Sequence, residues 1–209
     1  MKHRHIVVEG PIGCGKTSLA MRLAQKLNAD ALLEDAASNP FLPNFYRDMR
    51  RYALSTQLFF LFQRVQQLEG IRQPDMFAKP IVADFTLAKD PLFARLTLDD
   101  AEYQLYTRIY EHVKPQAPVP DLVIYLQASL DTLVYRVKKR GIAMESNIDE
   151  DYLRALSDAY TRYFHSYDES PLLIVNSERL NFVDNPEHFD LLLERINAMR
   201  GGREFFNRA

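Results

Sequence analysis

Apolar residues along the chain fall into short continuous runs, which alternate with longer segments whose apolar positions recur at helical spacing. The short runs predict strands at residues 5–10, 31–35, 80–85, 121–128 and 171–177. The longer segments predict helices at residues 16–27, 52–70, 99–113, 130–140, 150–167 and 186–199. Strands that are apolar throughout and separated by helices are typical of a parallel sheet. We therefore predict an α/β fold: a five-stranded parallel sheet with helices on both faces.

The composition of the 209 residues fits one domain, because 47% are hydrophobic and 26% are charged. We expect this domain to cover residues 1–200 and residues 201–209, which begin with two glycines, to form a flexible tail. The net charge of -2 gives no positive field for nucleic acid, and the apolar runs are far shorter than the roughly 20 residues that span a bilayer. With a single cysteine there is no internal disulfide. We expect a cytoplasmic protein without nucleic-acid or membrane partners.

Functional residues are expected where the predicted strands end, because ligands of parallel α/β sheets bind beyond the carboxyl ends of the strands. The segments at these positions are residues 10–17, Glu34 with Asp35, Asp84, and residues 177–182.

The loop after the first predicted strand carries a phosphate-binding motif. Gly10, Gly15, Lys16 and Thr17 satisfy the pattern G-x-x-x-x-G-K-[ST], between a predicted strand and a predicted helix. Glycines let backbone N–H groups converge on an anion, and the helix start adds its dipole. Lys16 is expected to reach the β- and γ-phosphates, and the Thr17 hydroxyl to ligate Mg²⁺. The residues predicted to hold the nucleotide phosphates are Gly10, Pro11, Ile12, Gly13, Cys14, Gly15, Lys16, Thr17 and Ser18.

Other residues must decide what happens to the phosphate, because such loops occur in kinases, GTPases, motors and switches. The chain has no convincing guanine-reading motif of the N-K-x-D kind. A small-molecule kinase needs a base near the acceptor hydroxyl, an acid for the metal and cations over the phosphoryl group. Glu34 is a candidate base, Asp35 competes for that role, and Asp84 is the candidate metal-associated acid. The alternative for Glu34 is a helix-entry or loop carboxylate, and the alternative for Asp84 is a strand-end or capping aspartate.

The predicted helix at residues 52–70 has two faces. Four leucines and Val65 form an apolar stripe at helical spacing. Gln57 and Arg64 are seven residues apart and share another face, with Phe60 between them. An amide, an aromatic ring and a guanidinium on one face suit a nucleobase. The alternative is a solvated polar flank.

The predicted helix at residues 130–140 ends in a cluster of cations. Arg136 and Arg140 are four residues apart and share a face, from which they are candidates to clamp phosphates in the transition state. The alternative is that they only favour the helix C-terminus before Gly141. The histidines offer no close ligand spacing apart from His3 and His5, and we assign none a role.

Further motifs accompany the loop along nearly the whole chain. They are E-x-x-x-x-NPFL-x-x-FY (34–46), TQLFFLFQR (56–64), D-x-x-x-x-x-D-x-x-FA (84–94), PDLVIYLQASLDTLVYRVKKRG (120–141), IDEDYLRAL (148–156) and NFVDNPEHFDLLLERI (181–196). Together they resemble the deoxynucleoside kinase family, in particular its short bacterial branch of deoxyadenosine and deoxyguanosine kinases.

The resemblance implies a P-loop kinase fold with a helical lid at about residues 136–150, and transfer of phosphate from ATP, with Mg²⁺, to the 5′-hydroxyl of a deoxynucleoside. It also implies a homodimer. By position, Glu34 resembles the general base, Gln57 the reader of the base edge, and Arg64 with Asp90 the pair that shapes base selectivity. Because of that pair, we expect purine deoxynucleosides or deoxycytidine as acceptors.

The remaining roles follow from the same resemblance. Asn181 and Phe182 lie where a family loop packs on the adenine of ATP, and Glu145 is the candidate for contact with the sugar. The residues predicted to act in catalysis are Glu34, Lys16, Arg136 and Arg140. Those predicted to bind the acceptor are Glu34, Gln57, Phe60, Arg64, Asp84, Asp90 and Glu145, and those predicted to hold the metal are Thr17 and Asp84.

Two positions depart from the family pattern. Phe85 follows Asp84 where the family often has arginine, and Ile142 stands where the lid often has another. We expect Lys138 or Lys139 to compensate only partly, because lysine lacks the bidentate fork of arginine.

Two rival functions stay open. A nucleoside monophosphate kinase, such as thymidylate kinase, would need arginines near the third predicted strand for the extra phosphate, and that segment offers only Lys89. A non-catalytic ATP-binding switch would fit the missing arginine and the sparse lid.

Overall fold

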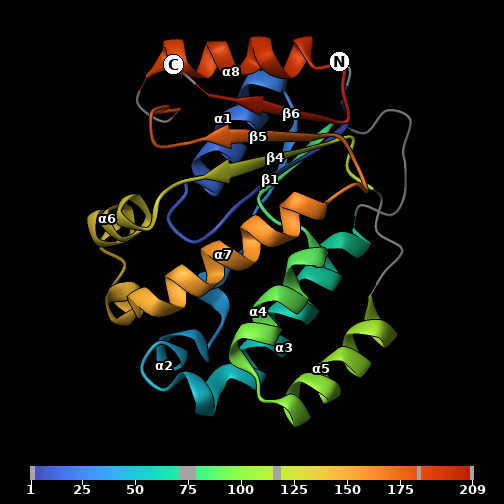
Figure 1. The fold of residues 1–209 in the computed structure, drawn as a ribbon. Helices are drawn as coiled ribbons and strands as arrows, with labels where there is room; N and C mark the ends of the chain where they lie inside the picture. Colours follow the sequence, from blue (N-terminus) through green and yellow to red (C-terminus); the bar gives the residue numbers. More distant parts are fainter. Residues whose placement is uncertain (1–2, 71–78, 115–118, 183–184, 208–209) are drawn as a thin grey trace.

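The computed structural model describes residues 3–70, 79–114, 119–182 and 185–207 (Figure 1). Within these residues, six strands form one sheet in the order β2-β3-β1-β4-β5-β6, and every neighbouring pair is parallel. The strands are β1 His5–Glu9, β2 Asp30–Leu32, β3 Ile81–Ala83, β4 Leu122–Gln127, β5 Leu172–Asn176 and β6 Arg203–Phe206. The chain runs from β1 to β2 and β3 on one side, then crosses to β4, β5 and β6 on the other. The carboxyl end of β1 is therefore the switch point of the sheet, where ligands of such folds bind.

Helices cover both faces of the sheet, as predicted (Figure 1). The helices are α1 Lys16–Leu27, α2 Leu42–Phe45, α3 Met49–Glu69, α4 Asp90–Thr97, α5 Asp100–Val113, α6 Leu130–Arg140, α7 Glu150–Ser166 and α8 Pro186–Ala198. Short 3-10 turns are η1 Ala36–Ser38, η2 Leu87–Lys89 and η3 Ala143–Asn147. Helices α1 and α8 pack on one face, and α7 lies on the other, above the group formed by α3, α4 and α5. No helix in the described part of the chain is long and apolar enough to cross a membrane.

The core forms because successive residues of a strand point to opposite faces. In β1, Ile6 and Val8 pack with α1 and α8, whereas Val7 packs with the aromatic residues of α7. All three are no more than 1% exposed. This two-sided burial explains why the strands are continuous apolar runs, and it fixes the switch point between two rigid layers.

The C-terminal segment corrects two predictions, the five-stranded sheet and the flexible tail after residue 200. Residues 203–206 form β6, which pairs with the open edge of β5. Phe206 packs against the core, and the Arg203 guanidinium donates to the carbonyls of His165 and Tyr167. Only one side of this short strand meets the core, so its sequence has no continuous apolar run. Residues 208–209 of the predicted tail lie outside the described residues.

Candidate active site

The loop after β1 has the backbone geometry that its glycines allow. Gly13 has φ 88° and Gly15 has φ 101°, both in the region that favours glycine. A Cβ on Gly13 would lie 2.8 Å from the Leu133 carbonyl oxygen, so α6 packs directly on the loop. Helix α1 begins at Lys16, whose Nζ donates to the Gly10 oxygen at 2.7 Å and to the Pro11 oxygen at 3.2 Å. The N-terminus of α1 and the Lys16 ammonium thus lie at the switch point, ready for an anion.

Glu9 anchors this loop, a role that the sequence prediction did not include. The Glu9 carboxylate is fully buried and accepts hydrogen bonds from the Gly10 and Thr86 backbone N–H groups at 3.2 and 2.6 Å. It also accepts from the hydroxyls of Thr86 and Tyr160, each at 3.2 Å. Glu9 therefore joins β1, the segment after β3 and α7. Its position directly before the first glycine of the motif is the signal that could have pointed to it.

Asp84 connects the loop with the end of β2. The Thr17 hydroxyl donates to Asp84 Oδ2 at 2.5 Å, and the Glu34 backbone N–H donates to Asp84 Oδ1 at 2.7 Å. Asp84 is 2% exposed, and its carboxylate and the Thr17 hydroxyl line one cavity. The two residues predicted to hold a metal are thus adjacent, and they offer hard oxygen ligands of the kind that Mg²⁺ prefers.

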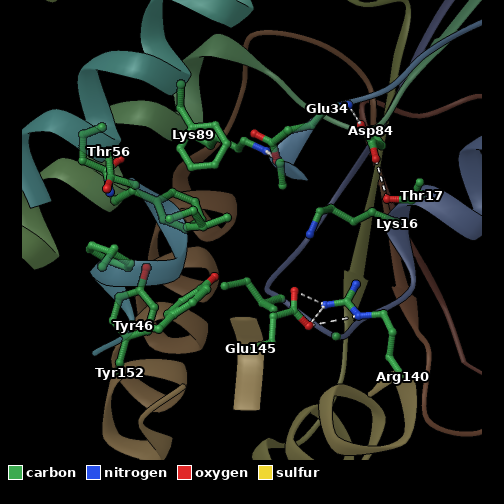
Figure 2. A pocket seen from close by; sticks show the side chains of 18 of the residues that line it. Lys16, Thr17, Glu34, Tyr46, Thr56, Asp84, Lys89, Arg140, Glu145 and Tyr152 are labelled. Carbon is green, nitrogen blue, oxygen red and sulfur yellow. Dashed lines mark hydrogen bonds and ion pairs between the residues drawn. The ribbon is translucent and has the colours of Figure 1, made fainter. Parts of the chain in front are cut away.

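A first cavity opens between this cluster and helices α2, α3 and α7 (Figure 2). Glu34 lies in it between two cations: Arg64 donates to Glu34 Oε1, and Lys89 Nζ lies 3.1 Å from Oε2. Burial alone would raise the pKa of Glu34, but Arg64, Lys89 and Lys16 together lower it to about 2. Glu34 is therefore ionised at neutral pH and presents a fixed carboxylate to the cavity.

The structure separates the two candidate bases. Asp35 is exposed, and its side chain accepts the Ser38 backbone N–H to cap η1. Glu34 lines the cavity. Asp35 therefore caps a 3-10 turn, while Glu34 is the acid that faces the space where an acceptor would lie.

Asp90 lies behind Arg64 and does not line the cavity. Arg64 donates to Asp90 Oδ1 as well as to Glu34, and both Arg64 and Asp90 are buried. Among the described residues, Asp90 Oδ2 has no hydrogen-bond partner. Burial raises the pKa of Asp90 to about 7, against the attraction of Arg64 and Lys89. Asp90, predicted to bind the acceptor, thus reaches the cavity only through Arg64.

The face of α3 that carries Gln57, Phe60 and Arg64 is turned into the cavity. Gln57 is 3% exposed and Arg64 is 4% exposed, so the alternative of a solvated flank is wrong. On this face, the Arg64 guanidinium lies 5.0 Å from the centre of the Phe60 ring. The Gln57 amide lines the cavity and offers both a donor and an acceptor, which suits a polar ligand at this position.

The two arginines of α6, Arg136 and Arg140, make contacts in different parts of the site. Arg140 forms a bidentate pair with Glu145 of η3, at 2.6 and 2.5 Å, and both residues line the first cavity. Arg136 instead donates to the carbonyls of Cys14 and Ser177, at 3.2 and 2.6 Å. Arg136 thus connects the P-loop with the end of β5.

Tyr46 and Tyr152 line the first cavity on the side opposite Arg140 (Figure 2). No periodic pattern in the sequence predicted that these two tyrosines belong to the site.

A second cavity lies on the other side of the P-loop. Asn181 and Phe182 line it, together with Arg136 and the segment after β5. Both cavities share part of the loop and Arg140, so they meet above the N-terminus of α1. The residues lining both are Gly13, Gly15, Ser18 and Arg140. Gly10 and Pro11 line neither cavity and act through the carbonyls that hold Lys16.

Comparison with known proteins agrees with this geometry. The model of the family described as "Deoxynucleoside kinase" matches residues 6–199. A deoxyguanosine kinase of Bacillus subtilis is 33% identical over 93% of this chain and 96% of its own length. A deoxyadenosine kinase of Lactobacillus acidophilus is 34% identical, over 92% of this chain and 94% of its own. A solved structure of deoxyadenosine kinase from M. mycoides with bound dATP superposes with a TM-score of 0.81 at 27% identity, covering 94% of this chain and all of that one.

Proposed function

Because the chain belongs to the deoxynucleoside kinase family, we propose that it transfers the γ-phosphoryl group of ATP to the 5′-hydroxyl of a deoxynucleoside. Purine deoxynucleosides or deoxycytidine are the proposed acceptors. The observation that carries this proposal is the meeting of two cavities above the P-loop. One contains an ionised carboxylate, and the other contains the loop proposed to pack on adenine.

The first cavity supports a nucleoside as the acceptor. The Gln57 amide offers a donor and an acceptor for the edge of a base, and Phe60 offers a ring beside it. Arg64 is held by Glu34 and Asp90, so its position is fixed before the base arrives. Glu145, which lines the same cavity and pairs with Arg140, is proposed to bind the hydroxyl of the sugar.

The proposed chemistry joins the two cavities. The 5′-oxygen attacks the γ-phosphorus, the bond to the bridging oxygen of ADP breaks, and the hydroxyl proton passes to Glu34. A carboxylate with a pKa of about 2 is a weak base. In a loose transition state, however, the hydroxyl loses its proton late, so Glu34 first orients the hydroxyl and then accepts the proton. Lys16 and Arg140 are the cations proposed to balance the charge of the phosphoryl oxygens.

We further propose that Thr17 and Asp84 hold Mg²⁺ together with the triphosphate, because both line the cavity beside the P-loop. The ion would neutralise charge on the phosphates.

Replacing Asp84 by asparagine should reveal this role. The new side chain would still accept the Glu34 backbone N–H through its amide oxygen, but it would offer the metal no negative charge. We expect the Mg²⁺ concentration for half-maximal activity to rise by roughly 10- to 100-fold. An activity titration with Mg²⁺ measures this, with Asp30→Asn, at an exposed acid of β2, as the control. Coincident titration curves for wild type and Asp84→Asn would remove Asp84 from the metal site.

Further proposals concern the extent of the domain, its lid, its location in the cell and its oligomeric state. We propose one kinase domain that includes β6, with a lid at about residues 136–150, working in the cytoplasm as a homodimer. The lid would include η3 and the end of α6, where Arg140 and Glu145 meet. Light scattering of the purified protein measures the mass, and a mass near the 24.3 kDa of one chain would contradict the dimer.

A panel assay tests the proposed function. The protein is incubated with ATP, Mg²⁺ and each of the four deoxynucleosides or their monophosphates, and the products are separated by chromatography. We expect 5′-monophosphates from the nucleosides, with the highest kcat/KM for a purine deoxynucleoside or deoxycytidine. Phosphorylation of monophosphates alone would identify a nucleoside monophosphate kinase. ATP binding without any transfer would identify a switch.

A further inference from the structure

Phe85 leaves the acceptor site without the arginine that the family pattern often has after the third strand. The Phe85 ring is 1% exposed and packs in the apolar cluster of α2, α3 and α4. Neither of the lysines expected to compensate lines the first cavity. Lys138 is exposed and pairs with Glu150, and Lys139 lies 5.9 Å from the centre of the Tyr135 ring. Lys139 lines the second cavity beside Arg136 and Arg140, and neither lysine contacts Glu34. Partial compensation by these lysines at the phosphates stays a prediction.

Lys89 supplies a cation at this place instead. It is the last residue of η2 and stands directly before α4, five positions after Asp84. Its ammonium lies 5.9 Å from the centre of the Phe85 ring and 3.1 Å from Glu34 Oε2. In Figure 2, the side chains of Lys89 and Glu34 point toward each other. The lysine thus passes over the ring that replaces arginine and reaches the carboxylate.

The Lys89 ammonium has donors to spare. An ammonium carries three N–H groups, and Glu34 is the only hydrogen-bond partner that this one has among the described residues. The side chain is nevertheless 3% exposed and lines the cavity. A buried ammonium with unused donors is costly unless a ligand oxygen meets them. The nearby position for such an oxygen is the part of the cavity between Glu34 and the P-loop.

Lys89 also fixes the orientation of the Glu34 carboxylate, together with Arg64. Arg64 binds Oε1 and Lys89 binds Oε2, so each carboxylate oxygen has its own cation. A carboxylate can accept about four hydrogen bonds, which leaves lone pairs for the acceptor hydroxyl. With both oxygens held, the carboxylate keeps one orientation toward the cavity.

We propose that Lys89 takes the place of the missing arginine: it positions Glu34 and donates to an oxygen of the acceptor or of the transferred phosphoryl group. This inference rests on the proposed function, because it assigns Glu34 to the 5′-hydroxyl. The segment after β3 would then contribute a cation to catalysis through Lys89, which the apolar ring of Phe85 cannot do.

Two substitutions of Lys89 test the inference. Lys89→Met keeps the length of the side chain but removes the charge, and we expect kcat to fall by about 10- to 100-fold, within the range for lost transition-state donors. KM for the deoxynucleoside should change by less than about threefold, because Gln57 and Phe60 still bind the base. Lys89→Arg should retain most of kcat. A residue with a merely structural role would not produce this split between kcat and KM.

A double variant tests the replacement directly. Phe85→Arg combined with Lys89→Met puts the cation on the strand-end position, beside the place that the ammonium occupied. We expect kcat of the double variant to exceed that of Lys89→Met by at least about fivefold. Lys79→Met, at an exposed lysine paired with Asp30 at 3.9 Å, is the matched control and should leave kcat unchanged. Thermal unfolding of each variant identifies those that fail to fold.

The possible results distinguish a failure of the proposed role of Lys89 from a failure of the proposed kinase activity. If wild type phosphorylates deoxynucleosides and folded Lys89→Met keeps the wild-type kcat, the inference is wrong and the proposed function stands. If Lys89→Met and Lys89→Arg lose kcat equally and KM rises in parallel, Lys89 only supports the fold of the cavity. If wild type transfers no phosphate to any nucleoside, the proposed function fails and the inference fails with it.

Discussion

Glu34→Gln is expected to lower kcat by roughly 10²- to 10⁴-fold, the usual range for loss of a general base, while KM for the deoxynucleoside stays within a few-fold. Glutamine keeps the shape of the side chain and can still accept from Arg64 or Lys89 through its amide oxygen. It cannot take the proton of the 5′-hydroxyl. The loss should therefore appear in the chemical step, not in binding.

The neighbouring acid provides the control for this experiment. Asp35 is exposed and caps η1, so Asp35→Asn should leave kcat near the wild-type value. Steady-state kinetics with the preferred nucleoside from the panel compares the two variants. Turnover that survives in Glu34→Gln would exclude Glu34 as the base, and a matching loss in Asp35→Asn would transfer the role to Asp35.

Much of the fold could be predicted because its elements carry complete local signals. Helix α6 was predicted with its observed bounds, since Ser129 caps its start and Gly141, at φ 66°, ends it. Helix α4 was missed, although its second residue is Pro91, a common start signal, because its eight residues make only about two helical turns, too few to establish a repeat. Strand β6 was missed because it is an edge strand, whose pairing depends on β5 rather than on its own sequence.

The residues of the site also differ in whether the sequence alone could predict their roles. The P-loop could be predicted because its chemistry lies in consecutive residues. The burial of Gln57 could not, because it depends on how α3 packs with α2, α4 and α5. Lys89 was noticed only as a cation near the third strand. Its contact with Glu34 joins residues 55 positions apart, and no spacing rule reveals such a pair.

Arg64→Met is expected to be the most destabilising of the single substitutions considered, because Arg64 is the partner of two buried carboxylates. Asp90 is fully buried, and Oδ2 already has no partner among the described residues. Removing one member of a buried ion pair typically costs about 3–5 kcal/mol, because the other charge is left unpaired. For a chain of this size, that corresponds to a fall in Tm of roughly 10 °C. Thermal unfolding followed by circular dichroism measures it.

A second arginine in the chain serves as the matched control. Arg95 pairs with Asp100 at 3.0 Å, but the two side chains are 61% and 87% exposed. Exposed pairs contribute less than about 1 kcal/mol, so Arg95→Met should lower Tm by only a few degrees. Equal losses in the two variants would contradict a special role for the buried pair.

The pH dependence of these variants should identify Asp90 as the cause. Burial raises the pKa of Asp90 to about 7 in the folded state, above its unfolded value near 4. An acid whose pKa is raised by folding binds protons more tightly in the folded state, so its contribution to stability is lost as pH rises toward the folded pKa. Without Arg64 that pKa should rise further, and Tm of Arg64→Met should fall more steeply than that of wild type between pH 6 and pH 8.

Adding Asp90→Asn removes the titrating charge, so the double variant should recover part of the lost Tm and show a flatter pH dependence. A double variant as unstable and as pH-sensitive as Arg64→Met would mean that the loss comes from Glu34 or from packing, because Asp90 would then carry none of it.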